Sequence, residues 1–321
     1  MENYLNKAGV FDFNDIPGAE SWVRISEITE GDSGDRKFYV KNNENERFFL
    51  RIADTNLYDR KKNEFEHLQA ANAMGAAVPK PVGFGLCGNG KSLYLQTRWI
   101  YGRQGAAGLK DLHPFKQYEL GMEAGLNLKL IHHCAISRKL PSEWERIQMN
   151  RCRQTLDAYQ NCRSKIAYEQ KIISLIEDNL HLLANRPQKL LHGGFHTENI
   201  ILSYEDNLSL IDFDRWQYGD PIFDLANVLT RIRHVSQPYA TGILDCYFAF
   251  GIKDQDLRLM NLYAAVDLIE QVVAARTGPA DKTRLILDQI QLFMRELQGC
   301  RNICPSWYKR SKSSGKNDVD L

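Results

Sequence analysis

The chain has 321 residues, a formal net charge of +1, and 43% hydrophobic and 25% charged residues. These values are typical of a globular protein that buries a large core, either as one unit with two lobes or as two domains. A net charge near zero argues against nucleic acid as a partner. No apolar run is long enough to cross a bilayer and no signal peptide is visible, so we expect no membrane partner. Seven scattered cysteines favour reduced thiols and a cytoplasmic location.

The first hundred residues predict a small antiparallel sheet with one helix. Helical spacing of apolar residues predicts a helix over 59–74, which Gly75 can end. Pro79 and Pro81 mark an extended return after it. β-branched and aromatic residues between turn signals predict strands over residues 22–28, 37–41, 47–52 and 92–100.

From about residue 111 the pattern becomes helical. Met122, Leu126 and Leu130 fall on one face of a helix, and Gly121 and Gly125 would let a second helix approach closely. Further helices are predicted over residues 150–160, 165–184, 256–275 and 281–299.

Together these patterns predict an α+β protein with a bilobal arrangement. We expect one lobe over residues 1–100 and a larger helical lobe over 101–305, with a hairpin over 200–213 embedded in it. The polar residues at the end of the chain favour a disordered tail over 306–321.

The hairpin carries the strongest chemical signal. A loop with His192 and Asn199 leads into two short apolar strands, and the second strand ends in Asp212. Kinase-like phosphotransferases assemble a magnesium–triphosphate site from such a loop and hairpin. Because Mg²⁺ prefers hard oxygen ligands and keeps several waters, the amide of Asn199 and the carboxylate of Asp212 suffice beside phosphate oxygens. Each residue taken alone could equally be a turn or strand-end residue with local hydrogen bonds.

Two residues near this loop are expected to support it. His192 would orient the loop through hydrogen bonds rather than react, and Asp224, at the start of a helix, can hold loop N–H groups. His196 is expected to be structural or to face the substrate.

The predicted sheet offers a nucleotide site. Ser33 lies in a glycine-containing turn between two strands, where backbone can cover phosphates, although this signal alone is weak. Arg51 on a strand can grip phosphate, with Glu64 on the following helix as its partner, or it can be an exposed edge residue. Thr97 and Trp99 lead from the last strand towards the helical lobe, at a hinge that can bind adenine or simply cross between lobes.

These residues together resemble the aminoglycoside phosphotransferase family of kinase-like enzymes. The resemblance covers residues 20–305 and is most specific in three stretches, LLHGGFHTENIIL, LSLIDFDRWQYGDPIFDLA and LNLKLIHH. It implies a bilobal protein-kinase-like fold and transfer of the γ-phosphate of ATP or GTP, with magnesium, to a small-molecule hydroxyl. It places Mg²⁺ ligation on Asn199 and Asp212, phosphate contact on Arg51 with Glu64, and the catalytic base at position 194.

Position 194 departs from the family pattern, because the chain has glycine where the family has aspartate. Gly194 cannot accept a proton, and loss of a positioned base costs on the order of 10²–10⁴ in rate. A displaced base could be Asp214, Glu198 or His196. The chain can therefore be an impaired small-molecule kinase or a non-catalytic nucleotide-binding pseudokinase, and a purely helical interaction protein leaves the spacing of Asn199 and Asp212 unexplained.

The acceptor substrate is predicted only as a class, a polar hydroxylated molecule. Four acidic residues could line a pocket for a cationic substrate such as an aminoglycoside, or could be solvated helix faces: Asp224, Asp245, Asp267 and Glu270.

Overall fold

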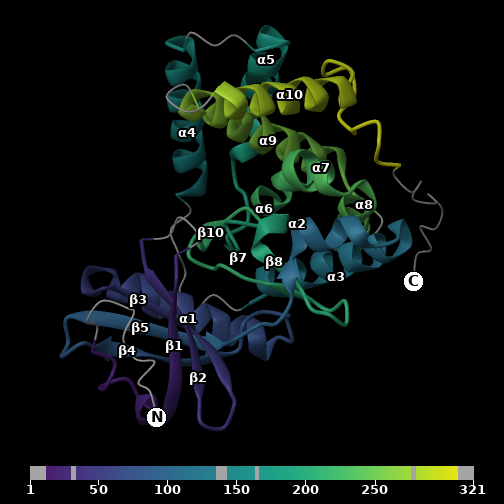
Figure 1. Ribbon diagram of the computed structural model, residues 1–321. Coiled ribbons are helices and arrows are strands. Elements are labelled where there is room, and N and C mark those ends of the chain that lie inside the picture. The colour runs from purple at the N-terminus through teal and green to yellow at the C-terminus, as the bar shows by residue number, and fades with distance from the viewer. Residues whose placement is uncertain are drawn as a thin grey trace, which may run out of the picture. The chain divides into compact units, whose positions relative to one another are not determined.

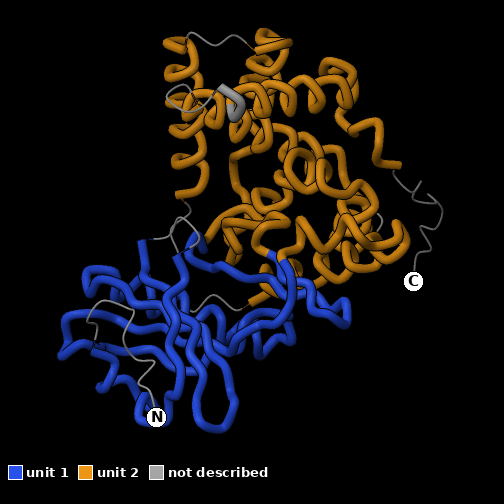
Figure 2. The backbone as a smooth tube through the Cα atoms, in the orientation of Figure 1, with its two compact units in different colours: residues 1–103, 200–216 blue, residues 104–199, 217–321 orange. Residues whose placement is uncertain are grey.

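The computed structural model describes residues 12–29, 34–134, 143–162, 166–249, 251–275 and 280–309. The chain divides into two compact units (Figure 2). Unit 1 comprises Met1–Arg103 and Ile200–Trp216, and unit 2 comprises Gln104–Asn199 and Gln217–Leu321. The α+β class and the bilobal kinase-like fold, with an antiparallel sheet in one lobe and helices in the other, are confirmed.

The hairpin segment groups with unit 1, whereas the sequence analysis placed it in the helical lobe. The backbone explains this grouping, since the Leu210 N–H donates to the Ala77 carbonyl over 2.8 Å. A Cβ atom added to Gly102 would lie 2.1 Å from the Leu202 carbonyl oxygen, so only glycine permits this close approach.

Unit 1 is built on a five-stranded antiparallel sheet with the strand order β1-β2-β3-β5-β4 (Figure 1). Its core includes Phe38, Leu50 and Ile52, which alternate inward along the central strands. The four predicted strands are confirmed, and the predicted extended return is itself a strand, at the sheet edge where proline is tolerated. The strands are β1 (Trp22–Ile28), β2 (Arg36–Asn42), β3 (Arg47–Asp54), β4 (Pro81–Cys87) and β5 (Ser92–Arg98).

One helix of unit 1, α1 (Tyr58–Ala73), follows the third strand as predicted. Its buried face is unusual for a small domain, because it contains Lys61 and Glu64 beside Leu68 and Ala71. Because a buried charge is costly without a partner, Lys61 and Glu64 must each be paired inside the unit.

Unit 2 is helical, and the helices predicted there are confirmed with shifted ends. The segment predicted as one helix over 165–184 is shorter, because α5 stops at Asn179 and a 3₁₀ turn, Leu180–Leu183, follows. The helices are α2 (Gly105–Gly108), α3 (Pro114–His132), α4 (Trp144–Gln160), α5 (Glu169–Asn179), α6 (Ile222–Asn227), α7 (Arg233–Val235), α8 (Gln237–Tyr247), α9 (Asp254–Ala275) and α10 (Ala280–Glu296).

Glycines bring α3 and α8 into close contact, as the sequence predicted for Gly121 and Gly125. A Cβ atom on Gly125 would lie 2.6 Å from the backbone oxygen of Ile243 on α8. The face of α3 with Met122, Leu126 and Leu130 is not the buried one, since Leu126 is exposed. The buried face runs through Leu120, Ala124, Leu128 and Ile131.

The start of the predicted tail packs onto unit 2. Tyr308 is buried, and its hydroxyl donates to Asp245 over 2.8 Å. The rest of the predicted tail, residues 310–321, lies outside the described residues.

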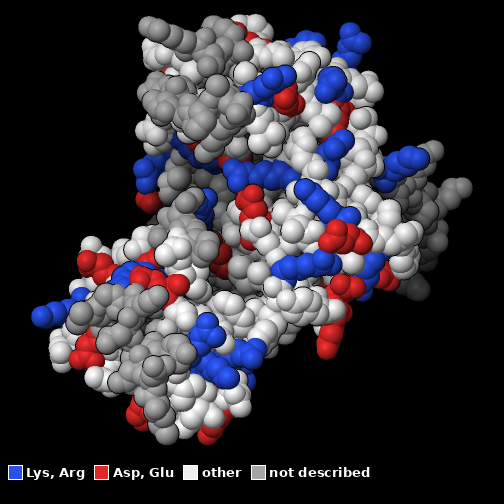
Figure 3. All heavy atoms as spheres, viewed as in Figure 1, with Lys and Arg blue, Asp and Glu red and all other residues white. Residues whose placement is uncertain are grey.

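On the face shown in Figure 3, acidic and basic side chains are interspersed, and neither kind covers the face as one continuous patch. All seven cysteines are free thiols. In the part of the chain that the structure describes, no helix has the length and apolar content needed to span a membrane.

Candidate phosphotransfer site

The hairpin after residue 200 pairs β8 (Ile200–Leu202) with β9 (Leu208–Leu210). The second strand therefore ends two residues before Asp212, which the sequence analysis had placed at its last positions. Asp212 instead adopts a left-handed backbone with φ of 68°. Aspartate is among the residues that adopt this region most readily, in turns as well as at functional sites.

Asp212 and Asp214 form a carboxylate pair in unit 1. The pKa of Asp212 is raised, first by desolvation and then by the charge of Asp214. Because the Asp212 side chain remains exposed to solvent, desolvation is incomplete and repulsion by Asp214 is an essential part of the rise in pKa. The Oδ1 atom of Asp214 is buried and has no hydrogen-bond partner among the described residues.

This donor set fits a divalent cation. Two crowded carboxylates, one with a buried oxygen left without a partner, repel each other until a cation or a proton lies between them. No group of three or more His, Cys, Asp or Glu side chains gathers as a metal site in the described ranges, so water and phosphate would have to complete the shell.

Arg51 is buried on β3 and pairs with Glu64 of α1 through Nη1, so the expected ion pair forms. Sequence reasoning missed two further members of the cluster. The Asp35 carboxylate accepts from Arg51 Nε over 2.8 Å, and Lys61 Nζ donates to the same carboxylate over 2.6 Å. The spacing of Lys61 and Glu64 by three residues on one helix was the available signal.

The loop after β7 (Lys189–Leu191) is held by Asp224, in unit 2. Its carboxylate accepts the backbone N–H of His192 over 2.7 Å and of Gly193 over 2.9 Å, as predicted. His132 Nε2 lies 3.1 Å from the same carboxylate, and His132 Nδ1 lies 2.7 Å from the Tyr247 hydroxyl. The role of His132 was not predicted, although its helix end was among the recognised stretches.

Gly194 is buried in this loop. Its N–H donates to His192 Nδ1 over 3.2 Å, and its carbonyl accepts from Asn199 Nδ2 over 2.9 Å. His192 thus orients the loop, as expected. Gly193 has a left-handed φ of 75°, whereas Gly194 is not among the glycines with positive φ. The Gly194 bond fixes the Asn199 amide so that its Oδ1 is the atom left to meet a cation.

The three alternatives for a displaced base lie in different surroundings. His196 Nδ1 lies 3.4 Å from Glu198 Oε2, and His196 Nε2 lies 3.4 Å from Asn199 Nδ2. Glu198 is exposed and turned towards the histidine. Asp214 belongs to the carboxylate pair of unit 1.

Three further residues were predicted to contact the nucleotide, namely Ser33, Thr97 and Trp99. Ser33 lies outside the described residues. Thr97 is buried on β5, and Trp99 packs edge-on against Tyr39 with ring centroids 5.0 Å apart. The backbone N–H of Trp99 already donates to the Arg47 carbonyl. A nucleobase could therefore contact Trp99 through its backbone carbonyl or its indole ring, but not through its backbone N–H.

The four acidic residues considered for a cationic substrate are each engaged within unit 2. Asp224 is buried beneath the loop, and Asp245 accepts from Tyr118 and Tyr308 hydroxyls. Asp267 accepts from Gln271, and Glu270 forms an ion pair with Arg151. Each of the four carboxylates therefore has a hydrogen-bond or ion-pair partner within unit 2.

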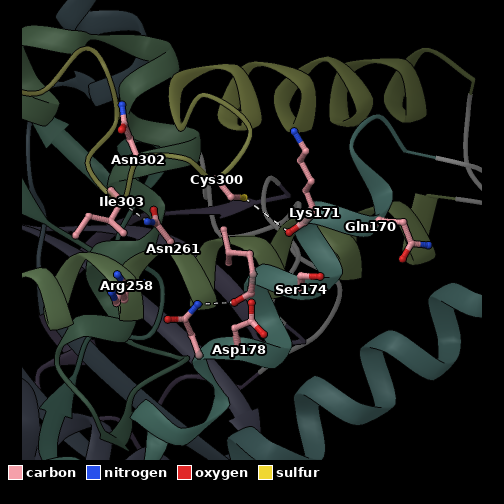
Figure 4. Close-up of a pocket in the computed structure, with 11 residues that line it drawn as sticks. Gln170, Lys171, Ser174, Asp178, Arg258, Asn261, Cys300, Asn302 and Ile303 are labelled. Carbon is pink, nitrogen blue, oxygen red and sulfur yellow. Dashed lines mark hydrogen bonds between the residues drawn. The ribbon is translucent and has the colours of Figure 1, made fainter.

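A separate cavity of about 290 Å³ opens in unit 2 between α5, α9 and the segment after α10 (Figure 4). Lys171, Asp178 and Arg258 stand at its walls, and Asn261 reaches into it from α9 while donating to the Ile303 carbonyl over 2.8 Å. No residue of the His192–Asn199 loop lines this cavity, so we treat it as distinct from the candidate site.

Comparison with known proteins gives a family and a fold. A family model described as "Phosphotransferase enzyme family" matches residues 24–262. No curated protein sequence matches the chain.

Solved structures with 13–14% sequence identity are similar to the chain, and at that identity the likeness shows the fold. An aminoglycoside phosphotransferase from Alicyclobacillus acidocaldarius has a TM-score of 0.60, with 14% identity and coverage of 87% of this chain and 92% of its own. A thermostable mutant of aminoglycoside phosphotransferase APH(4)-Ia, in ternary complex with ADP and hygromycin B, has a TM-score of 0.59, 14% identity and coverage of 86% and 95%. Spectinomycin phosphotransferase APH(9)-Ia, in complex with ADP and spectinomycin, has a TM-score of 0.55, 13% identity and coverage of 87% and 90%.

Proposed function

The chain belongs to the phosphotransferase enzyme family, and we propose that it transfers the γ-phosphate of ATP or GTP to a hydroxyl group of a small polar molecule. The observation that carries the proposal is the charge arrangement of unit 1. A buried Arg51–Glu64 ion pair lies within electrostatic reach of Asp212, which is itself crowded by a second carboxylate. Phosphoryl transfer is accelerated mainly by such fixed charges, which position and neutralise phosphate.

Each chemical role falls to a particular side chain. Asp212 and Asn199 would hold Mg²⁺, which when bound neutralises phosphate oxygens. Arg51 would contact phosphate, and Glu64 would fix the guanidinium. Thr97 and Trp99 would border the nucleoside, and His192 would keep the loop in place.

The acceptor side of the reaction rests on the structural neighbours. Proteins of this fold bind hygromycin B, spectinomycin and streptomycin, according to the complexes solved for them. We extend this class to the present chain as a hydroxylated, aminoglycoside-like or other polar alcohol. The four acidic residues of unit 2 add no support for a cationic acceptor, because their carboxylates already have partners.

A screen for phosphate transfer tests the proposal. The wild-type protein would be incubated with Mg²⁺ and γ-labelled ATP or GTP, against aminoglycosides, macrolides, choline-like alcohols and sugars. A labelled acceptor formed in multiple turnovers would support the proposal. The matched control is Asp212→Asn, which removes the anionic ligand and should abolish the product.

A second function is favoured by one observation, the glycine at position 194. In a pseudokinase the protein would bind nucleotide without turnover, because no carboxylate stands where the family carries its base. A nucleotide-dependent rise in Tm, together with no product from any acceptor, would favour this alternative.

A further inference from the structure

The buried charge cluster of unit 1 contains more than the expected ion pair. It consists of Asp35, Arg51, Lys61 and Glu64, with side chains that are each less than 10% exposed. Its formal charges cancel. Such a closed set is stable only while every partner is present, because an unpaired buried charge is strongly destabilising.

One oxygen atom is the centre of this cluster. Asp35 Oδ2 accepts from Arg51 Nε over 2.8 Å, from Arg51 Nη2 over 2.5 Å and from Lys61 Nζ over 2.6 Å. Two cations from different elements, β3 and α1, thus converge on a single anionic oxygen. A terminal phosphate oxygen is held by protein cations in this way, through charge-assisted bonds from an arginine fork and a lysine ammonium.

The two carboxylates of the cluster differ in how they are anchored. Glu64 lies on the same helix as Lys61, three residues away, and Lys61 Nζ is 3.4 Å from its Oε2. Asp35 lies outside the helix and directly precedes β2. Glu64 thus shares a helix with one of the two cations, whereas a separate segment of the chain brings Asp35 to them.

Asp35 remains an effective competitor at neutral pH. Burial favours its neutral form, but the charges of Arg51 and Lys61 and their hydrogen bonds outweigh burial and lower the pKa of Asp35 below its ordinary value. The Asp35 carboxylate is therefore ionised at neutral pH.

We propose that Lys61 is a second phosphate-contacting residue beside Arg51, and that Asp35 occupies the phosphate position in the nucleotide-free protein. Binding of a nucleoside triphosphate then requires a phosphate group to displace Asp35 from both cations. This inference rests on the proposed function, because it assigns the phosphate position within the same nucleotide site.

The test is a set of calorimetric titrations with ATP, GTP and inorganic tripolyphosphate. Asp35→Asn should tighten triphosphate binding about tenfold, since a neutral amide competes weakly with phosphate for two cations. Lys61→Met should weaken it about tenfold. Adenosine and guanosine, which lack phosphate, should bind with unchanged affinity to both variants.

Matched controls remove the same charges from the surface. Lys62→Met removes the charge of the neighbouring exposed lysine. Glu27→Gln, on β1, removes the charge of the carboxylate that pairs with Arg36 of β2 at the surface. Neither should change triphosphate affinity. If Lys61→Met alone fails to fold, the double variant with Asp35→Asn removes one charge of each sign, and it should bind triphosphate more weakly than Asp35→Asn does.

The outcomes separate this inference from the proposed function. A wild-type protein that binds triphosphate, with an Asp35→Asn variant that binds no tighter or binds more weakly, overturns the inference alone and makes Asp35 a support for Arg51. Absence of triphosphate binding in the wild type and in Asp35→Asn overturns both.

Discussion

Gly194 decides how much chemistry the loop can perform. Its backbone has no left-handed φ, so an aspartate can take its place without the steric cost that Gly193 would impose. We predict that Gly194→Asp raises kcat by about 10²–10⁴, the usual worth of a positioned base. Nucleotide affinity should change little, because the base meets the acceptor and not the phosphates. The measurement is kcat of both proteins on an acceptor found by the screen.

Gly193→Asp is the control for this substitution. It adds the same carboxylate one residue earlier, at a φ of 75°, and should lower stability without raising kcat. Equal kcat for the wild type and Gly194→Asp would place the base elsewhere. His196 would then be tested first, because it lies beside Asn199 and next to Glu198.

His67 is expected to make stability depend on pH. Burial lowers the pKa of this side chain to about 4 from an ordinary 6.5, so the folded protein binds fewer protons than the unfolded chain between these values. The contribution of His67 to the free energy of unfolding is therefore fully present above pH 6.5 and is lost as pH falls from 6.5 towards 4. We expect about 1–2 kcal/mol after allowance for partial exposure. Denaturant unfolding of the wild type and of His67→Gln from pH 4 to 8 measures it, and parallel pH profiles would contradict the prediction.

The contact of α3 with α8 depends on backbone approach. A methyl group at Gly125 would lie 2.6 Å from the Ile243 carbonyl oxygen and would force the helices apart. We predict that Gly125→Ala lowers the free energy of unfolding by about 1–3 kcal/mol. Leu126→Ala, one residue later on the same helix but 49% exposed, should change it by less than about 0.5 kcal/mol. Similar effects of the two substitutions would show that the close contact contributes nothing.

The helices and strands that could be predicted from the sequence are those whose residue pattern matches the way they pack in the structure. The strands through Phe38 and Leu50 were found because β-branched and aromatic residues lie between turn signals there. β4 was read as an extended return because prolines and glycines obscure that pattern at a sheet edge. The apolar spacing in α3 did not indicate its buried face, because Leu126 is apolar yet exposed and burial depends on a partner helix that one segment cannot reveal.

The parts of the candidate site that could be predicted are those whose residues are recognised from their spacing in the sequence. The Arg51–Glu64 pair and the support of the loop by Asp224 followed from their positions in the recognised pattern. Asp35 and Lys61 were missed, because their contact depends on the start of β2 meeting α1 in three dimensions. The left-handed φ of Asp212 likewise could not be predicted, since aspartate adopts both this region and the extended one and the sequence does not say which.

The chain distributes the proposed metal ligands over both units. Asp212 belongs to unit 1 and Asn199 to unit 2, and the hairpin of β8 and β9 connects them along the chain.

Calorimetric titration of ATP or GTP with and without Mg²⁺ tests the account most directly. We predict that Mg²⁺ tightens nucleotide binding to the wild-type protein, and that Asp212→Asn and Asn199→Ala each reduce this gain. Arg51→Ala should weaken binding even without the metal, because the guanidinium meets phosphate directly. Nucleotide binding of equal strength with and without Mg²⁺ in the wild type would contradict the metal assignment, and no nucleotide binding at all would contradict the proposed function.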